Sequence, residues 1–252
     1  MKINKFKKVG TNKYRLYFDN YSLLLYEDVI LKYNLLYKKD VDNDLLIEID
    51  EANKKAGIYD TALKYIGIRM RSIKEMRNYL EKKDFDKKDI DNTIDKLMNQ
   101  GLLNDKSFAK SYVNDKINLT NSGIDKIKNE LEKLGVEDEY IDEAIRNVDS
   151  TILKNKLVKI IEKELKLNCK LPINKMKNKI INRCITLGYK FEDINDILDN
   201  YELVSSSNIK NDYDKLYNKY SSKYDEYKLK SVIKSKLYQK GYSVDEINKV
   251  VD

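Results

Sequence analysis

Five lysines between Thr151 and Lys170 recur at three- and four-residue steps, a spacing that places them in one narrow sector of a helix. Leucine and isoleucine side chains occupy roughly the opposite side. Ammonium groups arranged in this way could contact DNA phosphates or an acidic protein surface. The alternative is an ordinary solvated lysine face. The five residues are Lys156, Lys159, Lys163, Lys166 and Lys170.

More cations follow on the next predicted helix. Residues 150–190 carry 11 basic and 2 acidic groups, an excess of +9, whereas the whole chain carries +7. Because Lys, Asn, Ile and Tyr are all abundant, as in proteins from A/T-rich genomes, the position of the charge says more than its total. This segment is therefore the main candidate for binding DNA or an acidic partner. Its further cations are Lys175, Lys177, Lys179 and Arg183.

A second candidate contact consists of Arg69, Arg71 and Arg77. Arginine is much rarer than lysine in this chain, so a bias toward lysine codons does not explain the cluster. The planar guanidinium suits two-pronged contacts with carboxylate or phosphate. The alternative is that the three side chains pair with Asp and Glu of their own chain.

Catalytic and metal-binding patterns are weak or missing. The chain contains no His, the commonest acid–base group and metal ligand, and it has no Gly-rich phosphate loop. Cys169 and Cys184 are too few for a disulfide framework, and we expect both to be reduced. The stretch from Asp40 to Glu51 resembles a calcium loop but has Leu45 where that loop needs Gly, so a solvated turn leading into a helix is the better interpretation. We expect neither an enzyme nor a bound cofactor or metal.

The candidate lysines and arginines lie within an internal sequence repeat of 51 to 53 residues. Each copy of the repeat has one apolar or aromatic residue that we use as its reference position, or anchor. Apolar residues recur nine and five positions before each anchor and five and nine positions after it. Pairs spaced by four share one helix face. Gly precedes three of the four anchors, and Asp84 precedes the first; both residue types tolerate the left-handed conformation that ends helices. The anchors are Phe85, Val136, Tyr189 and Tyr242.

Each repeat also has an earlier helix, so we expect three helices four times over. These earlier helices are predicted around Thr61 to Arg69, Asp105 to Ile117, Thr151 to Leu167 and Asp212 to Tyr220. Ser72 with Glu75, and Ser243 with Glu246, are capping boxes. Such units bury little apolar surface alone, so they are expected to stack into an elongated array. A single compact bundle is the alternative.

The first 55 residues differ from the repeats. Lys13 to Phe18 and Tyr21 to Leu25 indicate a β-hairpin, with Ile3 to Val9 as a third strand and Glu27 to Tyr33 as a short helix. Ser205 to Asn208 is the expected linker before the fourth repeat. The fold class is thus mainly α. The expected divisions are the N-terminal β-hairpin and short helix at 1–55 and three-helix repeats at 56–103, 104–149, 150–203 and 208–252.

The stretch from Ala62 to Val148 resembles the RecX family. In the first repeat the resemblance lies in Ala62 to Ile66, Arg69 to Ser72, Glu75 to Arg77 and Leu80. In the second it lies in Gly101 to Asp105, Phe108 to Ala109, Tyr112 to Val113, Gly123 to Ile124 and Leu131 to Gly135. Leu103 to Ala109, with the pattern Leu-Asn-Asp-x-x-Phe-Ala, is the most specific piece. The hairpin and the four repeats look like the longer RecX proteins of Gram-positive bacteria.

The resemblance implies a regulator of recombination and DNA repair rather than an enzyme. RecX-like proteins dock along the filament that the RecA recombinase forms on single-stranded DNA, and they inhibit strand exchange and co-protease activity in the SOS response. We therefore expect a monomer that binds this filament and single-stranded DNA. The alternative is a nucleic-acid-binding helical-repeat protein without a recombinase partner. No apolar run long enough to span a membrane occurs, and the N-terminus is polar, so we expect a cytoplasmic protein.

Overall fold

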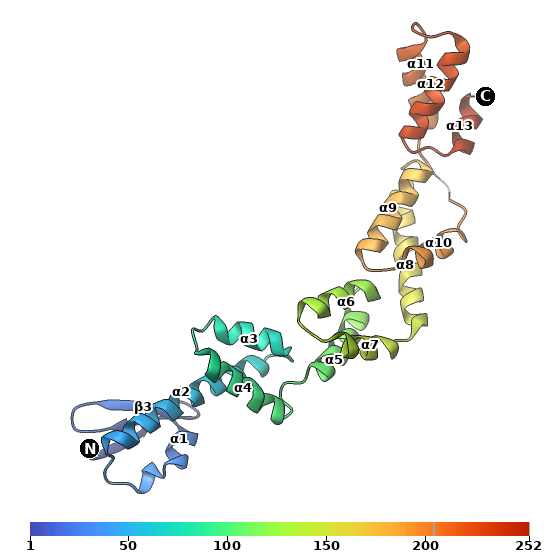
Figure 1. The fold of residues 1–252 in the computed structure, drawn as a ribbon. Helices are drawn as coiled ribbons and strands as arrows, with labels where there is room; N and C mark the ends of the chain where they lie inside the picture. The colour runs from blue at the N-terminus through green and yellow to red at the C-terminus, as the bar shows by residue number, and fades with distance from the viewer. Residues whose placement is uncertain (204, 252) are drawn as a thin grey trace. The chain divides into compact units, whose positions relative to one another are not determined.

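A computed structural model describes residues 1–203 and 205–251, and these are mainly α-helical with one small sheet (Figure 1). The contacts divide the chain into two compact units. One comprises residues 1–109 and 132–140, and the other comprises 110–131 and the chain from 141 onward. The N-terminal elements are β1 (Lys5–Lys8), β2 (Lys13–Tyr17), β3 (Ser22–Tyr26), α1 (Glu27–Lys32), the 3-10 helix η1 (Leu35–Tyr37) and α2 (Asn43–Ile66).

The predicted hairpin and third strand form an antiparallel sheet of order β1-β2-β3. Alternation along each strand gives the sheet two faces. One face carries Leu16 and Leu25, which are fully buried against Val29 and Ile30 of α1 and Ile49 of α2. This small core explains why the first residues fold differently from the repeats.

The expected helix around Thr61 to Arg69 is wrong in its extent, because α2 is continuous from Asn43 to Ile66. Its first half contributes Ile49 to the core under the sheet, and its second half contributes Ile58 and Ala62 to the core of the first repeat. The division expected between residues 55 and 56 therefore falls inside one helix. Residues 43–56 contain no Pro or Gly, so nothing interrupts α2 between the half that packs under the sheet and the half that packs in the first repeat.

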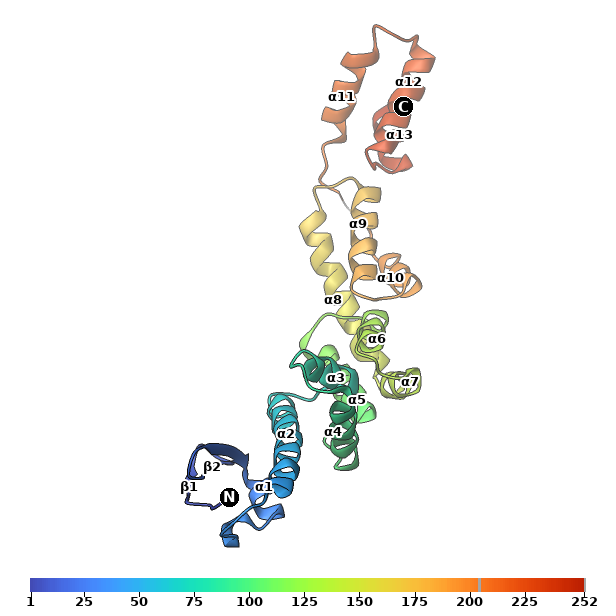
Figure 2. The same ribbon diagram turned by 60° about the vertical axis from the view of Figure 1, so that its left-hand side comes forward.

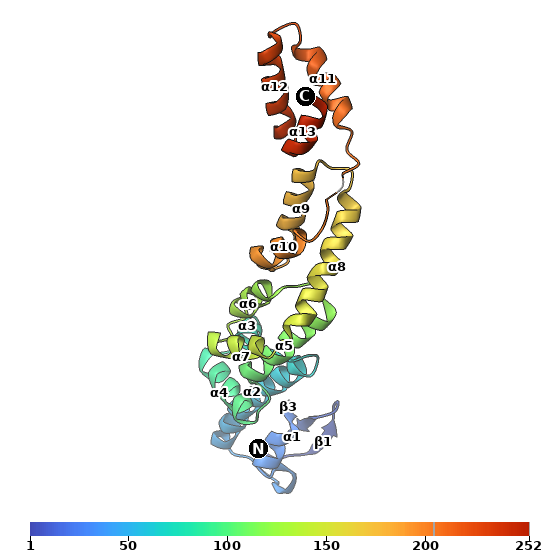
Figure 3. The ribbon, with the colours of Figure 1, turned by 90° about the vertical axis from the view of Figure 1, so that its right-hand side faces the viewer.

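The other expected helices are confirmed, and their ends lie within a few residues of the expected ones (Figure 3). The first repeat adds α3 (Ile73–Glu81) and α4 (Lys87–Asn99) to α2. The second contains α5 (Asp105–Leu119), α6 (Ile124–Lys133) and α7 (Asp138–Arg146). The third contains α8 (Ser150–Asn168), α9 (Ile173–Thr186) and α10 (Phe191–Leu198). The fourth contains α11 (Ile209–Tyr220), α12 (Glu226–Gln239) and α13 (Val244–Val251).

The repeat's turn chemistry is confirmed at all four positions. Asp84 has φ 59°, and Gly135, Gly188 and Gly241 have φ 79°, 89° and 98°. Each ends the middle helix of its repeat, where the left-handed conformation lets backbone N–H groups reach the last carbonyls. The apolar positions on either side pack inward: Met76, Ile127, Ile180 and Ile233 are all at most 1% exposed. The periodicity therefore predicted both the helices and their inward faces.

The expected linker from Ser205 to Asn208 is tied to neighbouring helices. The backbone N–H of Ser206 donates to the carbonyl of Cys169 at 2.7 Å, and the Ser205 hydroxyl donates to the carbonyl of Leu171 at 2.7 Å. The Asn208 side chain accepts from the N–H of Asn211 and caps α11. The segment thus satisfies carbonyls after α8 and begins the fourth repeat.

Candidate interface residues

Helix α8 is capped at its N-terminus by Asp149, whose carboxylate accepts from the N–H of Thr151. Its apolar side is buried, with Leu157 2% exposed and Ile161 fully covered. Packing of this side against α9 and α10 turns the lysine side outward, and Figure 2 shows α8 beside α9. Four of the five predicted lysines are exposed: Lys159, Lys163, Lys166 and Lys170.

Lys156 has a different environment from the other four lysines of the predicted face. Its ammonium group donates to the carbonyl of Thr120 at 2.8 Å and also to the carbonyl of Ile117. Both carbonyls lie at the C-terminal end of α5, where the helix dipole is negative and carbonyls lack helical partners. Lys156 therefore caps α5. The sequence pattern could not separate it from the other four lysines, because its partners lie 36 and 39 residues away.

On α9, Lys177 forms an ion pair with Asp199 at 3.1 Å. The other predicted cations, Lys175, Lys179 and Arg183, are exposed. Within the part of the chain that the structure describes, the segment from α8 to α9 thus presents seven candidate cations without a carboxylate partner: Lys159, Lys163, Lys166, Lys170, Lys175, Lys179 and Arg183.

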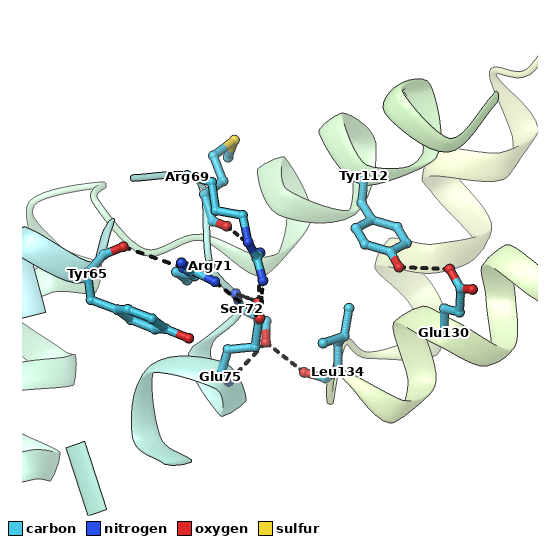
Figure 4. Close-up of polar contacts among 9 residues, drawn as sticks. Tyr65, Arg69, Arg71, Ser72, Glu75, Tyr112, Glu130 and Leu134 are labelled. Atoms are coloured by element: carbon cyan, nitrogen blue, oxygen red, sulfur yellow. Dashed lines mark hydrogen bonds and ion pairs between the residues drawn. The ribbon is translucent and has the colours of Figure 1, made fainter. Parts of the chain in front are cut away.

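The three clustered arginines all contact their own chain, and Figure 4 shows the contacts of Arg69 and Arg71. Arg69 pairs with Glu75 at 2.5 Å, and Arg77 pairs with Asp91. The Arg71 guanidinium lies 3.9 Å from the ring centroid of Tyr65 and 3.7 Å from the Glu75 carboxylate. Only 10% of the Arg71 side chain is exposed. These are the contacts that pairing within the chain predicts.

Ser72 is fully buried at the beginning of α3, between the first and second repeats (Figure 4). It forms the predicted capping box with Glu75, and its hydroxyl also donates to the carbonyl of Leu134 at 2.7 Å. Asp105 accepts from the backbone N–H of Ile73 at 2.9 Å. Burial raises the pKa of Asp105, and this hydrogen bond offsets part of the rise. The start of α3 is therefore held by two groups from the second repeat.

The same type of junction links the later repeats. The N–H of Gly123, just before α6, donates to the carbonyl of Leu187, and the N–H of Asp125 donates to Gly188 at 3.1 Å. Just inside α9, the N–H of Asn174 donates to the carbonyl of Gly241 at 3.0 Å. In each case, orphan N–H groups at the start of one middle helix bond to the turn that ends the middle helix of the next repeat.

Gly123 has an ordinary φ, so its residue type needs a different explanation. A Cβ placed there would lie 2.5 Å from the carbonyl carbon of Gly188. Gly123 therefore allows two backbones to approach closely. Sequence reasoning missed these junction contacts because the bonded residues lie between 32 and 67 positions apart in the sequence.

A polar cluster in the second repeat joins α5 to α6. The Tyr112 hydroxyl donates to Glu130 at 2.8 Å (Figure 4), and Lys116 pairs with Glu130 at 2.6 Å. Burial acts to raise the pKa of Glu130, but the bonds from Lys116 and Tyr112 outweigh it and hold that pKa below its ordinary value.

The chain matches two family models, described as the first and second three-helix domains of RecX, at residues 59–97 and 104–145. The Regulatory protein RecX of Streptococcus thermophilus is 30% identical, and the match covers 98% of this chain and 97% of that protein. The chain belongs to the RecX family. The Regulatory protein RecX of Bacillus subtilis is 28% identical over 97% of this chain and 95% of its own.

Solved RecX structures share the fold. A crystal structure of regulatory protein RecX aligns with TM-score 0.66 at 23% identity, covering 79% of this chain and 98% of its own. RecX from Lactobacillus salivarius aligns with TM-score 0.54 at 28% identity, covering 59% and 96%. The RecX models match the repeats that contain α3 to α7, whereas the cations of α8 and α9 lie outside both models. The full-length relatives extend over all four repeats.

Three further features of this RecX chain concern a cysteine, metal ligands and the calcium-like stretch. Burial raises the pKa of the Cys184 thiol to about 11, so this thiol is not an activated nucleophile. Within 1–203 and 205–251, no group of three or more His, Cys, Asp or Glu side chains could hold a metal. The calcium-like stretch forms the beginning of α2, where Asp42 accepts from the N–H of Leu45 as a helix cap. None of the helices in these residues is long and apolar enough to span a membrane.

Proposed function

We propose that this chain regulates the RecA recombinase by binding to the filament that RecA forms on single-stranded DNA, and that binding inhibits recombinase and co-protease activity. The observation that carries the proposal is the near-complete match to proteins named Regulatory protein RecX. The family resemblance supplies RecA as the partner. A chain of repeats joined through helix ends suits a regulator that must contact more than one subunit of a helical filament.

The seven candidate cations of α8 and α9 are the proposed contact with DNA phosphates or with acidic RecA side chains. They lie on one segment with an excess of +9, and their ammonium and guanidinium groups face solvent. Cations that release counterions from phosphate give binding a steep dependence on salt. Lys156, Lys177 and the three arginines are left out of this proposed contact, because each is already bonded within the chain.

The same cations also fit the alternative function, a nucleic-acid-binding repeat protein that has no recombinase partner. The two functions differ in stoichiometry. A filament regulator acts on the assembly and needs few copies for each filament, whereas a DNA competitor must cover the strand. Measurement of how inhibition depends on protein concentration therefore distinguishes them.

The decisive experiment measures the DNA-dependent ATPase of RecA with increasing amounts of this protein. Inhibition well below one copy per RecA subunit is the expected result. Inhibition that begins only when the protein saturates the DNA would favour the alternative, and an unchanged ATPase together with no retention on RecA–DNA filaments would reject the proposal.

The proposed contact is tested with Lys159→Gln/Lys163→Gln/Lys166→Gln. Loss of filament affinity and a flatter salt dependence are expected. The control variant Lys82→Gln/Lys87→Gln/Lys88→Gln removes three exposed charges from the first repeat. Equal behaviour of the two variants would show that α8 supplies only general positive charge.

A further inference from the structure

The N-terminal sheet has a second face that the hydrophobic core does not use. Strand pairing places Lys5 opposite Tyr17 in one row and Lys7 opposite Arg15 in the next. Lys5, Lys7 and Arg15 are exposed, while Tyr17 is half-buried. This outer face is defined by these four residues, and its rows lie about 7 Å apart along the strands.

Positive charge is concentrated in the strands of this small region. Residues 1–26 carry six basic groups and one acidic group, whereas residues 27–61 carry five basic and nine acidic groups. The sum, +1, hides this separation. The single acid of the strand region, Asp19, already accepts from Asn4 at 2.8 Å.

The arrangement of charges on the outer face does not favour the stability of the sheet. Lys7 and Arg15 are directly paired across two strands, and like charges in such pairs repel. In the region that the structure describes, no carboxylate lies within ion-pair distance of Lys5, Lys7 or Arg15. By contrast, Lys13 in the next row lies over the ring of Tyr26, and its charge helps to lower the pKa of Asp60 in α2. Lys7 and Arg15, which repel each other, have no such compensating partner among the described residues.

We propose that this outer face binds the phosphate backbone of a single-stranded nucleic acid. Three unpaired cations in two adjacent rows match successive phosphates, and an anionic strand would relieve the repulsion between Lys7 and Arg15. Tyr17 offers a ring beside these cations on which an unstacked base can lie. An aromatic ring on a sheet suits single strands, because the bases of a duplex stay stacked inside it. The contact is separate from α8 and α9 and does not rest on a recombinase partner.

The test uses the full chain carrying Lys5→Gln/Lys7→Gln/Arg15→Gln and a fluorescein-labelled oligothymidylate. Fluorescence anisotropy over a range of salt concentrations gives the slope of log K against log salt. Loss of three phosphate contacts should reduce that slope by about 2 and weaken binding. The Lys82→Gln/Lys87→Gln/Lys88→Gln variant is the charge-matched control and should keep the parent slope. Thermal melting should show that the sheet variant remains folded, because its substitutions remove repulsion and touch no buried group.

A second variant tests the aromatic part of the surface. Tyr17→Leu should weaken oligothymidylate binding roughly tenfold and leave the salt slope unchanged, because it removes stacking but no charge. Equal slopes for the sheet and control variants would overturn the proposal. So would preferential binding of a duplex of the same length, or displacement of the oligonucleotide by polyglutamate at equal charge concentration, since these results would indicate a duplex site or an acidic protein partner.

Discussion

The junction between the first and second repeats and the junction between the second and third solve one problem by different chemistry. Both must satisfy the free N–H groups at the start of a middle helix. At the first, the side chains of Ser72 and Asp105 accept from the N–H groups of Glu75 and Ile73, and the Ser72 hydroxyl also donates to the carbonyl of Leu134. At the second, backbone groups around Gly123 and Gly188 bond directly. The same architecture is therefore sensitive to lost side chains at one junction and to any added Cβ at the other.

The largest effect is expected for Gly188→Ala. Gly188 has φ 89°, and an added Cβ would overlap the backbone nitrogen of Lys126. Strain and loss of the close approach should together cost about 3 kcal/mol. Urea denaturation measures the loss, and hydrogen exchange should locate it at the start of α6.

Gly101→Ala is the matched control for that change. Gly101 has a similar φ of 71°, but a Cβ there meets nothing within 4 Å. Its cost should be limited to backbone strain, about 1 kcal/mol. Equal losses in the two variants would mean that the contact between Gly188 and the second repeat contributes nothing beyond conformation.

Ser72→Ala should cost about 2 kcal/mol. The change removes a helix cap and leaves the partly buried carbonyl of Leu134 without its donor. Ser243→Ala breaks the same kind of capping box on α13, where the described residues show no second bond from the hydroxyl, and it should cost about 1 kcal/mol. If thermal melting shows no greater loss of stability for Ser72→Ala than for Ser243→Ala, the hydrogen bond from Ser72 to Leu134 contributes nothing to the junction.

The contrast between the junctions shows what the sequence could predict. The repeat, its left-handed turns and its inward faces follow from spacings of four residues and from Gly or Asp at fixed positions, so local chemistry was sufficient. The extent of α2 was missed because one helix enters two different cores, and the change of partner leaves no local break near residue 55.

The candidate interface was predictable only in part. Spacing identified which cations share a face of α8, but it could not show that Lys156 bonds to carbonyls at the end of α5. Likewise, the near-neutral total for the first 61 residues concealed a basic sheet face, which depends on strand register. Long-range partners and register are tertiary properties, and a single sequence carries little information about either.

Lys156 and Lys159 allow this distinction to be tested within one helix. Lys156→Gln should lower stability by about 1 kcal/mol, because it removes a cation from a helix C-terminus. Lys159→Gln should leave stability unchanged and reduce the magnitude of the salt slope for single-stranded DNA by about 0.7. Parallel denaturation and anisotropy measurements compare the two variants. A loss of stability for Lys159→Gln equal to that for Lys156→Gln would contradict the assignment of separate roles.

The smallest effect concerns pH and has opposite signs at two acidic groups. Burial raises the pKa of Asp105 above 3.8, so the folded chain binds this proton more readily than the unfolded chain. Its contribution to stability therefore increases as pH falls toward that raised pKa. Glu130 has a pKa held below 4.5, so its contribution is present above that value and is lost as pH falls through the folded pKa.

Asp105→Asn and Glu130→Gln separate these two effects, because each replaces an ionisable group with a neutral one of similar shape. Between pH 7 and pH 4, the stability of the parent relative to Asp105→Asn should increase, whereas its stability relative to Glu130→Gln should decrease. Urea midpoints at several pH values measure both differences. The Asn side chain can still accept from the N–H of Ile73, so the comparison isolates charge from capping. Parallel pH profiles for the two variants would show that the carboxylate at the first junction experiences no more burial than the ion-paired one in the second repeat.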